Sequence, residues 1–152
     1  MKHIGFTGTR HGMTREQALA VVIVAASYVK QGERWTAHHG DCIGADEGFH
    51  DLAHNVGATI VGHPSTHNLR AYREFDVEHD RKAPMVRNAD IVRESDVMIA
   101  CPYEATEQPR GGTWATIRMA RMARKPLAIV LPDGTVQRER WPVDDAKPGS
   151  AP

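Results

Sequence analysis

The sequence predicts an α/β fold in which a mostly parallel sheet of five or more strands lies between two layers of helices. Short apolar segments typical of buried strands alternate with segments of helical periodicity. Glycine-containing loops join several of these strand–helix pairs, as in parallel sheets covered on both faces. The chain has 152 residues, of which 41% are hydrophobic and 25% charged, which is enough for one domain with a substantial core.

The first part of the chain gives three predicted strands and two predicted helices. We expect strands at residues 2–7, 34–38 and 58–62, and helices at 15–30 and 45–55. Thr14 and Gln17 have the spacing of a capping box at the start of the first helix. The side of that helix predicted to face the core is its apolar set of Ala18, Leu19, Val22, Ile23 and Ala26.

The second part begins with residues 64–82, which have no clear periodicity and are expected to contain a short helix or to form a lid. The elements expected after it are a helix at 85–94, a strand at 97–101, a helix at 117–124, a strand at 127–131 and an edge strand within 136–143. Residues 1–143 then form a single domain. Residues 144–152 are rich in proline, glycine and small polar residues and are expected to be a disordered tail.

Composition limits the class of partner. The formal net charge is zero, so nothing demands a polyanion, and a nucleic-acid partner is disfavoured. The longest apolar run, residues 18–26, is too short to cross a membrane. The two cysteines, Cys42 and Cys101, fit reduced thiols in a cytoplasmic protein, and neither lies in a zinc-binding pattern. We expect no cofactor.

Three loops, each following a predicted strand and preceding a predicted helix, are candidates for binding phosphate. Carboxyl ends of parallel strands meet at one edge of the sheet, so the loops should converge there. Glycines allow close approach of the backbone, a helix start offers free N–H groups, and an arginine can pair with a phosphate. The candidate binding residues are Gly8, Thr9 and Arg10 in the first loop, Gly40, Asp41, Gly44 and Asp46 in the second, and Gly111, Gly112 and Thr113 in the third.

Acidic and aromatic residues near these loops have two interpretations each. Asp41 and Asp46 either accept hydrogen bonds from ribose hydroxyls or cap a helix. If chemistry occurs, one of them could act as a general base or stabilise an oxocarbenium-like state. Trp114 either stacks on a base or packs in the core or at a subunit interface.

Two adjacent histidines, His38 and His39, end the second predicted strand. Their side chains point to opposite faces of the sheet, so at most one should face a ligand. The sequence spacing suggests no third ligand for a metal, and we predict no metal site.

These segments resemble the SLOG superfamily, which includes the Lonely Guy phosphoribohydrolases and the Rossmann-like domain of DNA-processing protein A. The resemblance covers residues 3 to about 134 and is carried by the motifs at residues 5–10, 39–46, 95–100 and 111–113. It implies a Rossmann-like three-layer sandwich, a nucleotide or nucleotide-derived ligand, and a homodimer or homotetramer.

The resemblance also suggests catalytic candidates. In Lonely Guy enzymes the loop that corresponds to the third loop of this chain reads like PGGxGTxxE. The glutamate of that motif assists cleavage of an N-glycosidic bond. Here Thr116 stands where that glutamate would fall, whereas Arg87 stands where the family's catalytic arginine would. An acid from elsewhere, Glu104 or Asp41, would have to substitute.

Three functions therefore remain open at this point. The first is binding of a nucleotide at the carboxyl edge of the sheet, with possible hydrolysis of its N-glycosidic bond. The second is a non-catalytic module that senses or sequesters a signalling nucleotide, which the missing glutamate favours. The third, single-stranded DNA binding, is disfavoured by the zero net charge.

Overall fold

A computed structural model describes residues 1–67 and 69–142, and its centre is a seven-stranded sheet in the order β4-β3-β2-β1-β5-β6-β7. All neighbouring strands pair in parallel except β6 and β7, which are antiparallel. The strands are β1 (Lys2–Gly8), β2 (Trp35–His39), β3 (Thr59–Gly62), β4 (Val77–Glu78), β5 (Val97–Cys101), β6 (Leu127–Val130) and β7 (Val136–Glu139).

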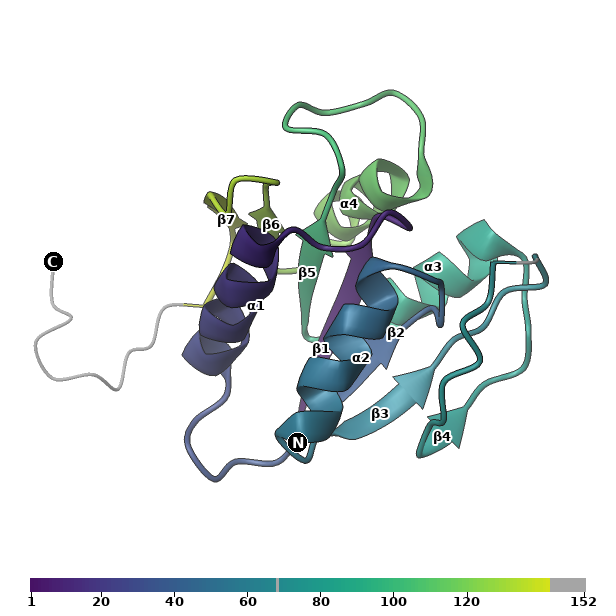
Figure 1. Cartoon of the computed structure of the whole chain (residues 1–152), viewed down its shortest axis with the longest axis horizontal. Helices are drawn as coiled ribbons and strands as arrows, with labels where there is room; N and C mark the ends of the chain where they lie inside the picture. Colours follow the sequence, from purple (N-terminus) through teal and green to yellow (C-terminus); the bar gives the residue numbers. More distant parts are fainter. Residues whose placement is uncertain (68, 143–152) are drawn as a thin grey trace, which may run out of the picture.

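Four helices cover the two faces of this sheet (Figure 1). They are α1 (Arg15–Tyr28), α2 (Ala45–Asn55), α3 (Pro84–Glu94) and α4 (Gly112–Met122). In Figure 1, α1 and α2 lie in front of the sheet, and α3 and α4 lie behind it. Two buried apolar clusters, one on each face, hold the layers together. The chain therefore has the predicted three-layer α/β fold.

The order of strands places a crevice at the middle of the sheet. From β1 the chain winds outward through β2 and β3 to β4, and then returns to β5 on the other side of β1. The strand order thus reverses between β1 and β5, whose register runs from Ile4↔Val97 to Gly8↔Cys101. The carboxyl ends of strands at such a switch point diverge into loops on opposite faces, which leaves room for a ligand.

The predicted core-facing side of α1 was wrong. Leu19, Val22 and Ile23 are 58%, 49% and 67% exposed. The buried positions are instead Gln17, Val21, Val24 and Ala25.

Gln17 explains the rotation of α1. The predicted capping box with Thr14 is present, and the Gln17 Nε2 also donates hydrogen bonds to the Pro102 and Val130 carbonyls at 2.9 and 3.0 Å. A helix that is apolar almost all round can present either side to the sheet, and here a polar residue selects the side.

The stretch at residues 64–82 contains no helix in the part that the structure describes. It contributes the short strand β4 and two isolated bridges, Cys42↔Arg70 and Ser65↔Lys82. It therefore wraps along the edge of the sheet beside β3. Helix α4 also begins earlier than predicted, at Gly112.

No helix among the described residues is both long and apolar enough to cross a membrane. The expected tail, residues 144–152, and residue 143 lie outside the part of the chain that the structure describes.

Candidate functional site

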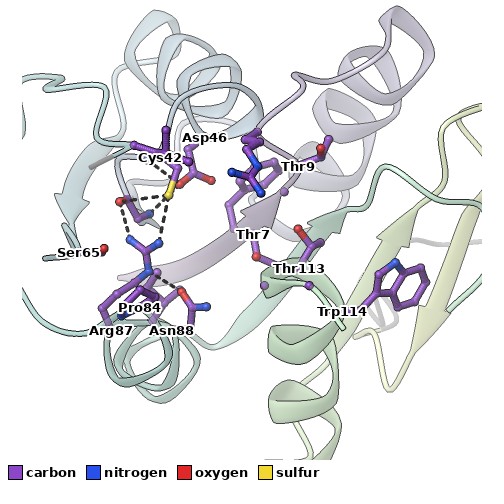
Figure 2. A pocket seen from close by; sticks show the side chains of 18 of the residues that line it. Thr7, Thr9, Cys42, Asp46, Ser65, Pro84, Arg87, Asn88, Thr113 and Trp114 are labelled. Atoms are coloured by element: carbon purple, nitrogen blue, oxygen red, sulfur yellow. Dashed lines mark hydrogen bonds between the residues drawn. The ribbon is translucent and has the colours of Figure 1, made fainter. Parts of the chain in front are cut away.

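A cavity of about 450 Å³ lies at the carboxyl edge of the sheet, where β1, β2 and β5 end (Figure 2). All three predicted loops contribute to its wall. Ten of the twelve predicted site residues line it: Gly8, Thr9, Arg10, Gly40, Asp46, Arg87, Glu104, Gly111, Gly112 and Thr113. Asp41 and Gly44 do not.

The first and second loops are bound directly to each other. The Thr9 N–H donates to the Cys101 carbonyl at 3.0 Å, and the Ala45 N–H donates to the Thr9 carbonyl at 2.9 Å. Gly44 makes this contact possible, because a Cβ at this position would lie 2.4 Å from backbone atoms of Arg10. Gly44 therefore does not line the cavity, but it allows the two loops that do to pack against each other.

The third loop presents the start of α4 to the cavity. Its N-cap residue, Gly111, has φ 105° and ψ 144°, a conformation that glycine adopts without strain, and no side chain caps the helix. A Cβ at Gly112 would meet no atom within 4 Å, so the space in front of this residue is open. In Figure 2 the Thr113 hydroxyl points toward Thr7 at the end of β1. The unpaired N–H groups of a helix start attract anions.

Arg87 is buried, and its hydrogen bonds cross-link the cavity wall. Its Nη1 donates to the carbonyls of Gly40 and His63 at 2.6 and 3.0 Å, and its Nη2 contacts the Cys42 Sγ at 3.1 Å (Figure 2). Its Nε donates to the Asn88 side chain. Most of its five donors are thus used within the protein, and one Nη2 hydrogen is left for a ligand.

Asp46 is the buried carboxyl of the cavity. Its Oδ2 accepts hydrogen bonds from the Gly40 and Cys42 N–H groups, each at 3.1 Å. Burial raises the pKa of Asp46 to about 6, although Arg87 and these two N–H groups oppose the shift. Burial also raises the pKa of the Cys42 thiol to about 11, so this cysteine is a neutral thiol near neutral pH.

Asp41 lies behind the cavity, fully buried. Its Oδ2 accepts from the Arg70 Nε at 2.6 Å, and its Oδ1 accepts from the Arg73 N–H at 3.0 Å. Neither helix capping nor ribose binding, the two interpretations offered by the sequence, describes these contacts of Asp41. Asp41 instead anchors the stretch that follows β3 against the second loop.

Glu104 lies in the cavity wall, and its Oε1 accepts from the Trp114 Nε1 at 3.2 Å. Trp114 is 3% exposed and packs in the apolar cluster beneath α4. Thr116 is buried and donates to the Gly112 carbonyl at 2.8 Å. Thr116, which stands where the resemblance to Lonely Guy enzymes would place a glutamate, is therefore engaged within α4.

Sequence reasoning missed several cavity residues. The aromatic pair of Tyr103 and His11 has ring centroids 4.5 Å apart, and Tyr103 is 62% exposed. A tyrosine two residues after the end of a buried strand was the available signal for this pair. Ser65 also lines the cavity, but it comes from the stretch after β3, whose placement only the tertiary fold determines.

His38 and His39 point to opposite faces, and neither lines the cavity. The His39 Nε2 lies 2.9 Å from the His50 Nδ1 beneath α2. Although the sequence spacing suggested no third metal ligand, the fold brings His63 and Glu94 beside His38.

Comparison with solved structures relates the fold to known proteins. One is the molybdenum cofactor binding protein from the phototrophic bacterium Rippkaea orientalis, with a TM-score of 0.61 and 21% identity, covering 86% of this chain and 76% of that chain. Another is the protein TM1055, with a TM-score of 0.56 and 17% identity, covering 84% of this chain and 72% of that one.

No protein-family model matches the chain, and comparison with curated proteins gave no significant match. At these identities the structural likeness concerns the fold alone. It shows that this chain has a Rossmann-like α/β fold.

Proposed function

We propose that the chain is a SLOG-like protein that binds a nucleotide or nucleotide-derived molecule through its phosphate in the cavity at the carboxyl edge of the sheet. The observation that carries the proposal is the convergence of three separate loops on this cavity, with the uncapped start of α4 in its wall. A phosphate at Gly112 and Thr113 would accept hydrogen bonds from the backbone N–H groups there. The positive end of the helix dipole would also attract its negative charge.

Arg10 is the cation best placed to assist. It lies in the cavity wall, is exposed, and forms no ion pair with any described residue. Its guanidinium is therefore free to form a bidentate contact with a phosphate. Of the two other arginines in the wall, Arg70 is ion-paired with Asp41 and Glu78, and Arg87 uses four of its five donors within the protein.

The aromatic pair of His11 and Tyr103 suggests where the base lies. Tyr103 lines the cavity with an exposed ring on which a base could stack while its phosphate rests on α4. Stacking on such a ring tolerates different bases.

Asp46 is the strongest candidate for chemistry. A carboxyl with a pKa of about 6 can exchange a proton near neutral pH. In hydrolysis of an N-glycosidic bond, water adds to the anomeric carbon, the carbon–nitrogen bond breaks, and the base leaves with a proton. Asp46, as a carboxylate, would take the proton from water and pass it to the departing base, and Arg87 would hold the second loop in place. Because Thr116 replaces the family glutamate, binding without hydrolysis, as in a sensor, is the second form of this proposal.

The molybdenum cofactor binding protein gives independent support for a small-molecule ligand in this fold. The molybdenum cofactor therefore belongs beside nucleotides in any panel of ligands.

Isothermal titration calorimetry tests the binding proposal. We expect nucleoside monophosphates to bind and the matching nucleosides to bind at least about tenfold more weakly, because a charge-assisted phosphate contact is lost. Arg10→Ala should weaken the monophosphate to a similar degree. Arg15→Ala, which removes an exposed arginine of α1 outside the cavity, should not. Equal affinity for nucleoside and nucleotide would contradict the phosphate site.

Chromatography of the same mixtures tests hydrolysis. Release of free base that is lost in Asp46→Asn supports an enzyme, and binding without release supports a sensor. Binding of single-stranded DNA that falls steeply with salt, without binding of mononucleotides, would favour the DNA-binding alternative.

A further inference from the structure

Histidines from neighbouring strands form a row on the face of the sheet that carries α3, and none of them lines the cavity. His3 lies on β1 and His38 on β2, whereas His63 directly follows β3 and His79 directly follows β4. The His3 Nδ1 is 2.8 Å from the His38 Nε2, and the His38 Nδ1 is 3.0 Å from the His63 Nε2. Glu94, the last residue of α3, lies at the end of this row.

We propose that His38, His63 and Glu94, with His79 as a fourth ligand, bind a divalent transition-metal ion, for which zinc best fits the donor set. Two or three imidazoles with one carboxylate are typical zinc ligands, whereas magnesium and calcium prefer sites built from oxygen. The proposed site shares no residue with the cavity wall, although the Arg87 Nη1 of that wall donates to the His63 carbonyl.

The distances fit a tetrahedral ion. Zinc–nitrogen bonds of about 2.0–2.1 Å place neighbouring ligand atoms roughly 3.3 Å apart. One ligand atom each from His38, His63 and Glu94 lie within 4.8 Å of one another. The His79 Nε2 is 3.0 Å from the Glu94 Oε1, and the His79 and His63 ring centroids are 4.5 Å apart. His79 therefore lies beside Glu94 at the edge of this group of three, and rotation of its side chain would turn its Nε2 toward the same point.

The two inner imidazoles are prepared to act as ligands. Burial lowers the pKa of His38 to about 4 and that of His63 to about 3, with smaller contributions from neighbouring histidines. Both rings are therefore neutral at pH 7, and a metal need not displace a proton from a charged ring. The remaining nitrogen of His38 contacts His3, which would fix the ring orientation, as the outer partners of metal-bound histidines do.

The outer ligands provide a route of entry. The side chains of Glu94 and His79 are 31% and 38% exposed, whereas His38 and His63 are each 2% exposed. An ion could therefore reach the buried imidazoles from the side of α3. Once bound, it would join β2, the segments after β3 and β4, and the end of α3.

The full chain, stripped of metal with EDTA and dialysed, provides the test, with Co²⁺ and Zn²⁺ as probes. We expect one equivalent of Co²⁺ to give the visible absorption of a tetrahedral site, one equivalent of Zn²⁺ to displace it, and the melting temperature to rise. Glu94→Gln and His79→Ala, at partly exposed positions, should each weaken binding at least about tenfold. His54→Ala, an exposed histidine of α2, is the matched control and should bind like the unmodified chain.

Two results would overturn the site. The first is the absence of a tetrahedral Co²⁺ spectrum in the unmodified chain. The second is affinity in Glu94→Gln and His79→Ala equal to that of His54→Ala, which would assign any bound metal to surface histidines. Nucleotide binding is measured on the metal-free chain in a separate titration. The metal proposal and the nucleotide proposal can therefore fail independently.

Discussion

At the scale of single residues, the cavity depends on backbone contacts as much as on side chains. Gly44 has φ 94° and ψ −123°, and a Cβ there would meet the Arg10 backbone. The first two loops can therefore touch only because this residue is glycine. Gly57, which follows α2, also has a positive φ of 76°. A Cβ added there would meet no atom within 4 Å.

This contrast gives a prediction. Gly44→Ala should reduce the free energy of unfolding by about 2–4 kcal/mol, because backbone strain and a steric clash add together. Gly57→Ala should cost only about 1 kcal/mol, because it introduces strain alone. Urea denaturation of the two variants checks this. An equal loss in both would show that the contact between the loops contributes nothing to stability.

Residue types predicted the loops but not the roles of the acids. Glycine, threonine and arginine at the ends of strands were recognisable because their role in a loop depends on neighbours in the sequence. Asp41 and Asp46, by contrast, are five residues apart and look equivalent in the sequence. Which one faces the cavity depends on Arg70, which lies 29 residues from Asp41 along the chain.

At the scale of elements, periodicity located the helices well and oriented α1 wrongly. The bounds of α2 and β5 agree with the predicted ones. The orientation of α1 follows from the two carbonyls that Gln17 satisfies, and both belong to distant parts of the chain. β4 was missed because two residues are too few to show alternation.

The stretch between β3 and α3 is an element whose attachment can be tested. Asp41 holds it through the Arg70 side chain and the Arg73 N–H, and its own carbonyl accepts from the Ala71 N–H at 2.7 Å. Ser65, His67 and Leu69, which belong to this stretch, line the cavity. The buried ion pair thus holds one wall of the candidate site in place.

Asp41→Asn should therefore loosen this wall. Asparagine tolerates the left-handed backbone of this position, φ 56°, but it removes the charge and replaces one of the two accepting oxygens with an NH2 donor. We expect a loss of about 2–3 kcal/mol in stability. Hydrogen exchange at Ala71 and Arg73 should also become faster. Asp51→Asn is the control, because this exposed carboxylate pairs with the Arg73 side chain and, among the described residues, with no other cation. Unchanged exchange in Asp41→Asn would mean that other contacts hold the wall.

At the scale of the whole molecule, the sheet topology explains why the loops meet. Alternating strands and helices predicted a shared edge, and the reversal of strand order between β1 and β5 opens that edge between the two helix layers. Long-range packing also buries a group of histidines around β2 and β3, which the sequence did not predict. His38, His39, His50 and His63 are all buried.

These histidines should make the molecule sensitive to acid. Burial lowers the pKa of all four in the folded state, so the unfolded chain binds more protons below pH 6.5 and stability falls as the pH falls. Asp46 acts in the opposite direction, because its raised pKa of about 6 makes its contribution to stability decrease as the pH rises from about 4 to 6. One carboxyl offsets only part of the effect of four imidazoles.

We therefore expect the free energy of unfolding in EDTA to be roughly 2–4 kcal/mol lower at pH 5 than at pH 7. Urea denaturation at the two pH values measures the difference. Asp46→Asn removes the opposing group and should steepen the fall, whereas His54→Ala, at an exposed position, should leave it unchanged. A stability that is flat or rises on acidification would mean that the folded state does not lower the pKa of these imidazoles, and that the folded chain takes up protons on acidification at least as readily as the unfolded chain.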